Sequence, residues 1–140
     1  MKVDKQFIRV YDTIFSWVFK KNGLDGLIEF WKFIAPTMLS DLQAMVAKDG
    51  VKGAYKYWNQ VLQEEGAKFK LKLSKDERSL TLEMTNCPAY KALNIPTCPE
   101  YCRHCAVMYP EVLKPFGLTY QWNRKGAGRC EIKVGYIEGE

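Results

Sequence analysis

The spacing of apolar residues along the chain changes at Ala67. Before this residue, side chains such as Phe7 and Tyr11 recur at three- and four-residue steps, which predicts amphipathic helices. After it, apolar and polar residues alternate, as in strands with one solvent-facing side. Helices followed by strands, without a βαβ rhythm, predict an α+β fold with an antiparallel sheet. We therefore expect a single domain of 140 residues, helical over 1–66, with strands and short helices over 67–140.

The first helix is predicted from Val3 to Lys21 and ends at Asn22-Gly23, because glycine commonly follows a helix C-terminus. It is apolar over most of its circumference, so other elements or a second subunit must cover it. Further helices are expected at 24–34, 36–48 and 54–65, with Pro36 ending the first of these three and residues 50–53 forming a break.

Two β-hairpins are predicted in the second part of the chain. Residues 68–73 and 80–85 alternate in polarity around a charged turn at 75–78. The second hairpin runs from 118 to 137 around a glycine-containing turn at 125–128. In its last strand four side chains share a face that we expect to point toward the core: Cys130, Ile132, Val134 and Tyr136.

The segment between the hairpins carries the candidate site. Residues 87–105 read CPAYKALNIPTCPEYCRHC and contain four of the five cysteines and the only histidine. Cys87-Pro88 and Cys98-Pro99 each predict the start of a short helix, because proline is tolerated at the first helical position. A helix from Cys98 would place Cys98, Cys102 and Cys105 on one face, and a further short helix is expected after Pro110.

Metal binding is one interpretation of these thiols. Thiolates suit zinc or an iron–sulfur cluster, and the candidate ligands are Cys87, Cys98, Cys102 and Cys105. His104 lies roughly 100° from Cys105 around an ideal helix, so we do not expect it on the same face.

Nucleophilic catalysis is the second interpretation, with Cys98, Cys102 and His104 as candidate catalytic residues. A cysteine at a helix N-terminus, as predicted for Cys98 and Cys87, has its thiolate stabilised, and His104 is a candidate base. The third interpretation is structural, because reduced cysteine packs like a small apolar residue. We favour this third role for Cys130.

The overall composition narrows the class of protein. The chain is 47% apolar and 26% charged with a net charge of +5, and its lysines are dispersed, so we do not expect a nucleic-acid partner. No apolar stretch approaches the roughly 20 residues of a membrane span, and no secretory signal is visible. We therefore expect a cytoplasmic protein with no membrane partner, whose cysteines are reduced or metal-bound.

Three segments carry a resemblance to a known family: CPAYKAL at 87–93, CPEYCRHC at 98–105 and GRCEIKV at 128–134. Together with the helices and hairpin before them, they resemble the L-2-amino-thiazoline-4-carboxylic acid hydrolase family. The last segment is also similar to the end of 4-vinyl-reductase-type ligand-binding domains. Those domains combine N-terminal helices with antiparallel strands and are often dimeric, which agrees with the architecture predicted above.

The hydrolase resemblance implies opening of a cyclic amidine, in which water adds at the ring carbon between nitrogen and sulfur and N-carbamoyl-L-cysteine is released. It also makes Arg103 and Arg129 candidates for binding the substrate carboxylate, and Tyr101 a further candidate ligand-binding residue. Three functions remain open: a small-molecule-binding protein that hydrolyses such a bond, a metal or iron–sulfur module, and a homodimeric sensor of a small ligand.

Overall fold

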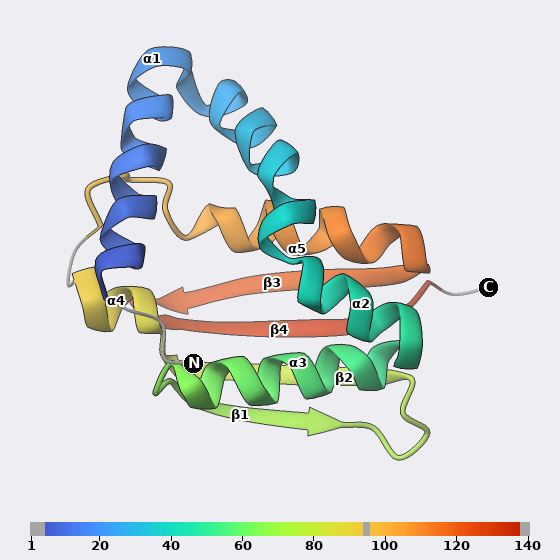
Figure 1. The fold of residues 1–140 in the computed structure, drawn as a ribbon. Coiled ribbons are helices and arrows are strands. Elements are labelled where there is room, and N and C mark those ends of the chain that lie inside the picture. Colours follow the sequence, from blue (N-terminus) through green and yellow to red (C-terminus); the bar gives the residue numbers. More distant parts are fainter. Residues whose placement is uncertain (1–4, 94–95, 138–140) are drawn as a thin grey trace.

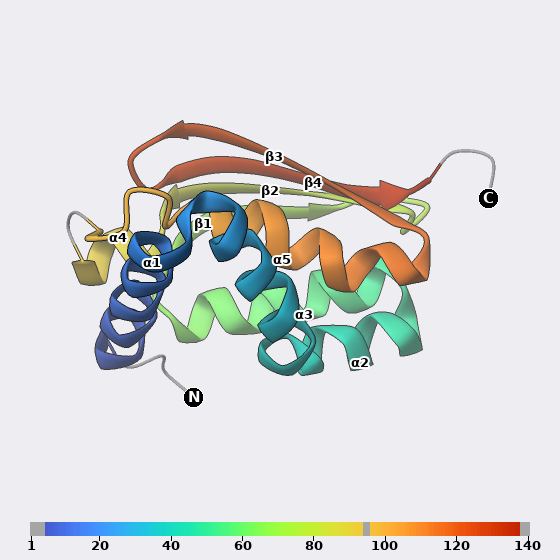
Figure 2. The same ribbon diagram turned by 90° about the horizontal axis from the view of Figure 1, so that it is seen from above.

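The computed structural model describes residues 5–93 and 96–137. It confirms the α+β fold, with N-terminal helices followed by a four-stranded antiparallel sheet. The helices form one layer and the sheet the other, so a single face of the sheet is covered (Figure 2). Among the described residues, no helix is both long enough and apolar enough to cross a membrane.

Helix α1 (Lys5–Met38) is bent at Gly23, whose φ of 71° and ψ of −171° interrupt the helix as predicted. Its two halves form an inverted V with the bend near the apex (Figure 1). Its predicted first residue, Val3, lies outside the described residues. The predicted stop at Pro36 is wrong, because the helix continues to Met38. Pro36 removes one backbone hydrogen bond, but burial of Ala35 on the preceding turn holds the helix together.

Helices α2 (Ser40–Asp49) and α3 (Val51–Glu64) are separated by Gly50 alone, so the predicted break at 50–53 is shorter than expected. The reason is close packing of the two helices. A Cβ atom on Gly53 would lie 2.0 Å from the Met45 carbonyl oxygen, which only glycine avoids. Gly53 is therefore the point of closest approach of α3 to α2.

The sheet consists of β1 (Lys68–Leu73), β2 (Ser79–Asn86), β3 (Leu118–Gly126) and β4 (Arg129–Tyr136) in the order β1-β2-β4-β3. Both predicted hairpins are confirmed. They join through β2 and β4, where Leu82 pairs with Ile132. The two leucines of β2 and the predicted inward residues of β4 face the helices, which builds the apolar core between the layers.

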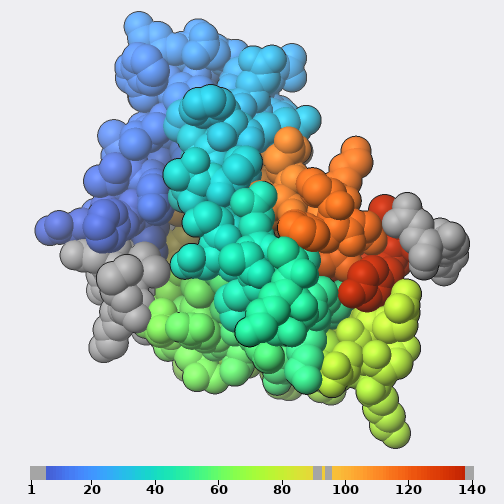
Figure 3. Space-filling view, turned by 45° about the vertical axis from the view of Figure 1, so that its right-hand side comes forward, coloured from blue at the N-terminus to red at the C-terminus, as the bar shows by residue number. Residues whose placement is uncertain are grey.

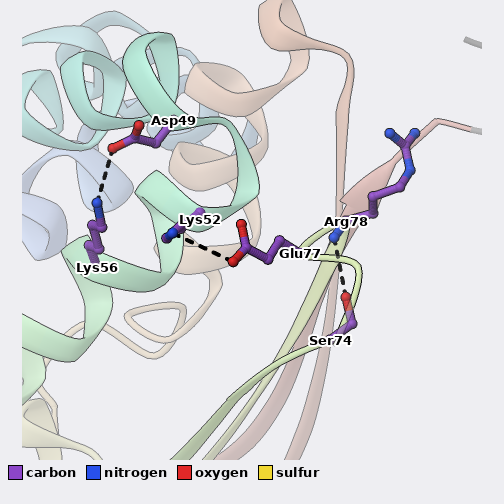
Figure 4. A network of polar contacts seen from close by, with 6 residues as sticks. All are labelled: Asp49, Lys52, Lys56, Ser74, Glu77 and Arg78. Atoms are coloured by element: carbon purple, nitrogen blue, oxygen red, sulfur yellow. Dashed lines mark hydrogen bonds and ion pairs between the residues drawn. The ribbon is translucent and has the colours of Figure 1, made fainter.

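Polar contacts tie the turn between β1 and β2 to α3 (Figure 4). Lys52 lies 3.5 Å from Glu77, and the backbone N–H of Arg78 donates to Ser74 Oγ at 3.2 Å. A second ion pair, Lys56 with Asp49 at 3.2 Å, links α3 to the end of α2. These exposed pairs contribute about 1 kcal/mol or less each, so they position the turn more than they stabilise the fold.

The segment between the hairpins departs from its prediction at Cys98-Pro99. Helix α4 (Pro88–Leu93) begins after Cys87 as expected, but no α-helix begins at Cys98-Pro99. Residues 98–102 form turns, and α5 (Arg103–Leu113) starts beyond them. Helix α5 continues through Pro110, and its last turn is the helical segment expected after that residue. A 3-10 helix, η1 (Lys114–Phe116), follows it.

The helices cover the sheet closely. The second half of α1, α2 and α5 lie side by side on the surface of the helical layer (Figure 3). Beneath them the largest buried side chains are aromatic, among them Phe15, Trp31 and Trp58. The cysteine segment lies at one end of the sheet, between the first half of α1 and the turn that joins β3 to β4 (Figure 1). This position brings thiols, helix ends and strand ends together.

Candidate functional site

A buried carboxylate on α1 positions the loop that carries Cys98. Asp12 is only 4% exposed, and its two oxygens accept the backbone N–H groups of Thr97 at 2.8 Å and Cys98 at 2.9 Å. Sequence analysis did not single out Asp12. The available signal was its place on the same face as Ile8 and Phe15, where an acidic residue is costly unless hydrogen-bonded.

The predicted helix start at Cys98, on which the expected activation of its thiol depended, is wrong. Its side chain is buried and does not lie at the N-terminus of an α-helix. Burial raises the pKa of the Cys98 thiol, and the charges of Asp12 and Glu100 raise it further, against a lowering by the Glu100 backbone N–H. Cys98 is therefore held as a thiol, since its environment opposes the thiolate.

Four cysteines from three parts of the chain line one small cavity of about 40 Å³. They are Cys87 before α4, Cys102 at the N-terminal cap of α5, Cys105 within α5 and Cys130 in β4. The backbone N–H of Cys87 donates to the carbonyl of Gly128 at 2.9 Å, which brings α4 to the β3–β4 turn. The lining set thus differs from the predicted one, because Cys130 takes the place of Cys98.

The environment of this cavity keeps its deeper thiols protonated. Burial raises the pKa of Cys130 to about 11, with the neighbouring Cys87 and Cys102 adding to the shift. Burial also raises the pKa of Cys105 well above its usual range, again with the neighbouring thiols contributing. Clustered thiols in an apolar cavity oppose one another's ionisation, so at neutral pH these two stay uncharged.

His104 contacts Cys105, contrary to the prediction from helix geometry. The His104 Nε2 atom lies 3.5 Å from the Cys105 sulfur, because the imidazole turns inward beside Tyr101, with ring centroids 4.9 Å apart. Its Nδ1 atom is hydrogen-bonded to the Tyr101 carbonyl. A carbonyl oxygen only accepts, so Nδ1 carries the proton and Nε2 faces the thiol as an acceptor. Burial lowers the pKa of His104, so the pair is a neutral imidazole beside a neutral thiol.

A larger cavity of about 330 Å³ adjoins the first. Its charged side chains are Glu100, Arg103 and Arg124, and the Arg103 Nε atom lies 2.7 Å from a Glu100 oxygen. Four residues line both cavities: Tyr101, Cys102, Trp122 and Arg124. The two cavities therefore meet at the start of α5 and at β3.

The predicted site residues are divided between these cavities. Cys98 and Arg103 line only the larger one, and Arg129 lines only the smaller one. Tyr101 lines both, and burial raises the pKa of its phenol. Trp122 and Arg124 were missed, because alternation in a strand indicates which face a residue occupies but not which distant segment lies over it.

The donor atoms do not form a ready metal centre. Within residues 5–93 and 96–137, no three Cys, His, Asp or Glu side chains stand in an arrangement that could hold a metal ion. The cysteines of the small cavity would have to turn toward one another before they could coordinate zinc with the usual tetrahedral geometry.

No family model, no curated protein and no solved structure matches this chain.

Proposed function

We propose that the protein binds a small anionic molecule in the larger cavity and presents the Cys102 thiol to it. The observation that carries the proposal is that Cys102 and Arg124 line both cavities. A ligand held by an arginine in the larger cavity therefore lies beside a thiol at the entrance to the smaller one.

The charges of the larger cavity favour an anion. Two arginines and one glutamate line it, which leaves one positive charge in excess. Guanidinium groups bind carboxylates through paired hydrogen bonds. The volume of about 330 Å³ is at the lower end of the range for small-molecule sites, so the ligand we propose is compact.

A cyclic amidine that carries a carboxylate meets both requirements, and it is the substrate class that the family resemblance implies. In the proposed hydrolysis, the oxygen of water bonds to the ring carbon between nitrogen and sulfur. The C–S bond of the ring then breaks, and the sulfur leaves as a thiol after taking up a proton. The carboxylate is proposed to pair with Arg124, and the ring to lie against Trp122.

The test uses L-2-amino-thiazoline-4-carboxylate with the full chain. Calorimetry is expected to detect binding that Arg124→Met weakens about tenfold or more, because a charge-assisted hydrogen bond is worth about 1.5–3 kcal/mol. Arg9→Met is the matched control, because this exposed arginine on α1 does not line either cavity. Cys102→Ser is expected to keep binding and to lose release of the product, measured by mass spectrometry.

The outcomes separate the open functions. Binding without product release would favour a ligand sensor over a hydrolase. Equal affinity of Arg124→Met and the wild type would contradict the proposed anion site.

A soft metal ion is the second candidate, favoured by the convergence of four cysteines from three parts of the chain on one small cavity. Thiolate ligation would require loss of their protons, which the metal's charge promotes. Metal content and absorption are measured on protein purified without oxygen or chelator. If this function is correct, Cys102→Ser loses the metal, and Cys98→Ser, whose residue lies outside the small cavity, keeps it.

A further inference from the structure

The first half of α1 carries an apolar stripe that the rest of the described chain leaves open. Four large side chains form it: Phe7, Val10, Ile14 and Trp17, exposed by 58%, 49%, 39% and 60%. They lie three, four and three residues apart, which places them on one face of a helix. The opposite face, which includes Ile8 and Phe15, is buried in the core. An exposed patch of this kind marks an interaction surface.

The spacing and the residue types of the stripe are the same in both directions along the helix. Its spacing is symmetric about position 12, with an aromatic residue at each end and branched aliphatic residues in the middle. In an antiparallel pair, Phe7 of one copy therefore lies against Trp17 of the other copy. Val10 of one copy lies against Ile14 of the other. This is the self-complementary pattern that a two-fold interface requires, in which the same patch serves both subunits.

An antiparallel pair is also favoured by electrostatics. The N-terminal end of a helix carries partial positive charge and the C-terminal end partial negative charge. Antiparallel packing brings unlike ends together, whereas parallel packing brings like ends together.

We infer that the protein forms a two-fold homodimer through this stripe, with the first halves of the two α1 helices antiparallel. An aromatic side chain buries about 150–250 Å² when fully covered, so Phe7 and Trp17 each leave roughly 100 Å² or more open. With Val10 and Ile14, two copies would bury roughly 600–800 Å² of apolar surface. Stable interfaces bury about 1,200–2,000 Å² in total, so an interface of this size is a weak one. We therefore expect a weak dimer, which dissociates on dilution.

This inference is independent of the proposed ligand site. The stripe lies on the face of α1 opposite Asp12, which points to the cysteine loop. The second copy therefore covers α1 and leaves the two cavities accessible.

The test is sedimentation velocity of the full chain between about 1 and 200 µM, a range that brackets a micromolar dissociation constant. Wild type is expected to pass from monomer to dimer across this range. Trp17→Glu and Val10→Glu are expected to weaken the dimer at least about a hundredfold, because each buries two charges, one from each copy.

Phe33→Glu is the matched control. Phe33, at 82%, is the most exposed large apolar side chain in the described part of the chain, but it lies on the second half of α1 and outside the stripe. Far-UV circular dichroism checks that each variant is folded. A wild type that stays monomeric at the highest concentration would overturn the inference, as would a dimer that only Phe33→Glu dissociates.

Orientation is tested by mixing Val10→Cys and Ile14→Cys chains and locating disulfides by peptide mapping. Disulfides between position 10 of one chain and position 14 of the other are expected to exceed those between identical positions. A dominant disulfide between position 10 of both chains would overturn the antiparallel arrangement.

Discussion

The Oδ1 atom of Asp12 accepts a hydrogen bond of 2.9 Å from the backbone N–H of Cys98, 86 residues further along the chain. This contact is buried, and the Asp12 carboxylate also accepts a hydrogen bond from the backbone N–H of Thr97. One side chain of the first helix therefore determines where the cysteine loop lies. The same contact sets a negative charge beside Cys98, which helps to raise the pKa of that thiol and keep it protonated.

Asp12→Ala is expected to lower the free energy of unfolding by about 2–4 kcal/mol, because it leaves two buried N–H groups without an acceptor. Urea denaturation measures the change. Asp25→Ala, an exposed aspartate on the same helix, is the control and is expected to change stability by about 0.5 kcal/mol or less. Equal effects of the two substitutions would contradict the role given to Asp12.

Cys98 is expected to resist alkylation by iodoacetamide at mildly alkaline pH in the folded protein, because its side chain is 1% exposed and burial raises its pKa. Cys102, which lines both cavities, is expected to react first. Peptide mapping over time gives the order, and labelling in urea shows that Cys98 reacts once it is accessible. Early modification of Cys98 in the native state would contradict its burial.

His104 is expected to remain neutral below its usual pKa of 6.5, because burial disfavours the charged form. Nuclear magnetic resonance of the only histidine reports this pKa directly, and its nitrogen shifts should show the proton on Nδ1. As the pH falls, the imidazole of the unfolded chain takes up a proton before the buried imidazole of the folded chain does. The contribution of His104 to the free energy of unfolding is therefore fully present above pH 6.5 and decreases as the pH falls below this value. A histidine that titrates at 6.5 or above would refute the buried geometry.

Glu65 has the opposite pH dependence. Burial first, and the charge of Glu64 second, raise its pKa from 4.5 to about 7. Between these values the folded protein holds a proton that the unfolded chain has lost, so stability falls as the pH rises from 4.5 to 7. Glu65→Gln is expected to raise the free energy of unfolding at about pH 8 by about 1–2 kcal/mol and to have little effect at about pH 4.

Glu111→Gln is the control for that measurement, because Glu111 is exposed on α5. It is expected to leave stability nearly the same at both pH values. A gain from Glu65→Gln that is equal under acidic and alkaline conditions would show that the ionisation of Glu65 is not its cause.

Gly53→Ala is expected to destabilise the protein by about 2–4 kcal/mol, because the added Cβ would meet the Met45 carbonyl oxygen at 2.0 Å and force α2 and α3 apart. Gly135→Ala provides the comparison. Its added Cβ would lie 3.6 Å from its nearest neighbours, an ordinary contact, so the expected change is below about 1 kcal/mol. Thermal or urea unfolding of the two variants distinguishes a steric clash from a general effect of losing glycine.

Prediction from sequence succeeded where structure depends on neighbouring residues. The helix break at Gly23, the start of α4 after Cys87 and both hairpins follow from turn chemistry and from the spacing of apolar residues within a few positions. It failed at Pro36, because packing of the surrounding helix outweighed the lost hydrogen bond.

By itself the sequence determined the α+β architecture, the hairpin boundaries and the segment in which a thiol site was to be sought, since periodicity and turn residues are local properties. Which groups meet there depends on contacts between distant parts of the chain. Cys130 joins Cys87 because the β3–β4 turn reaches α4, and Cys98 is held away by Asp12 on α1. Arg124 reaches the cavity because β3 lies beside α5. Contacts between such distant positions arise from the packing of the sheet on the helices. The spacing of residues within one segment does not predict this packing.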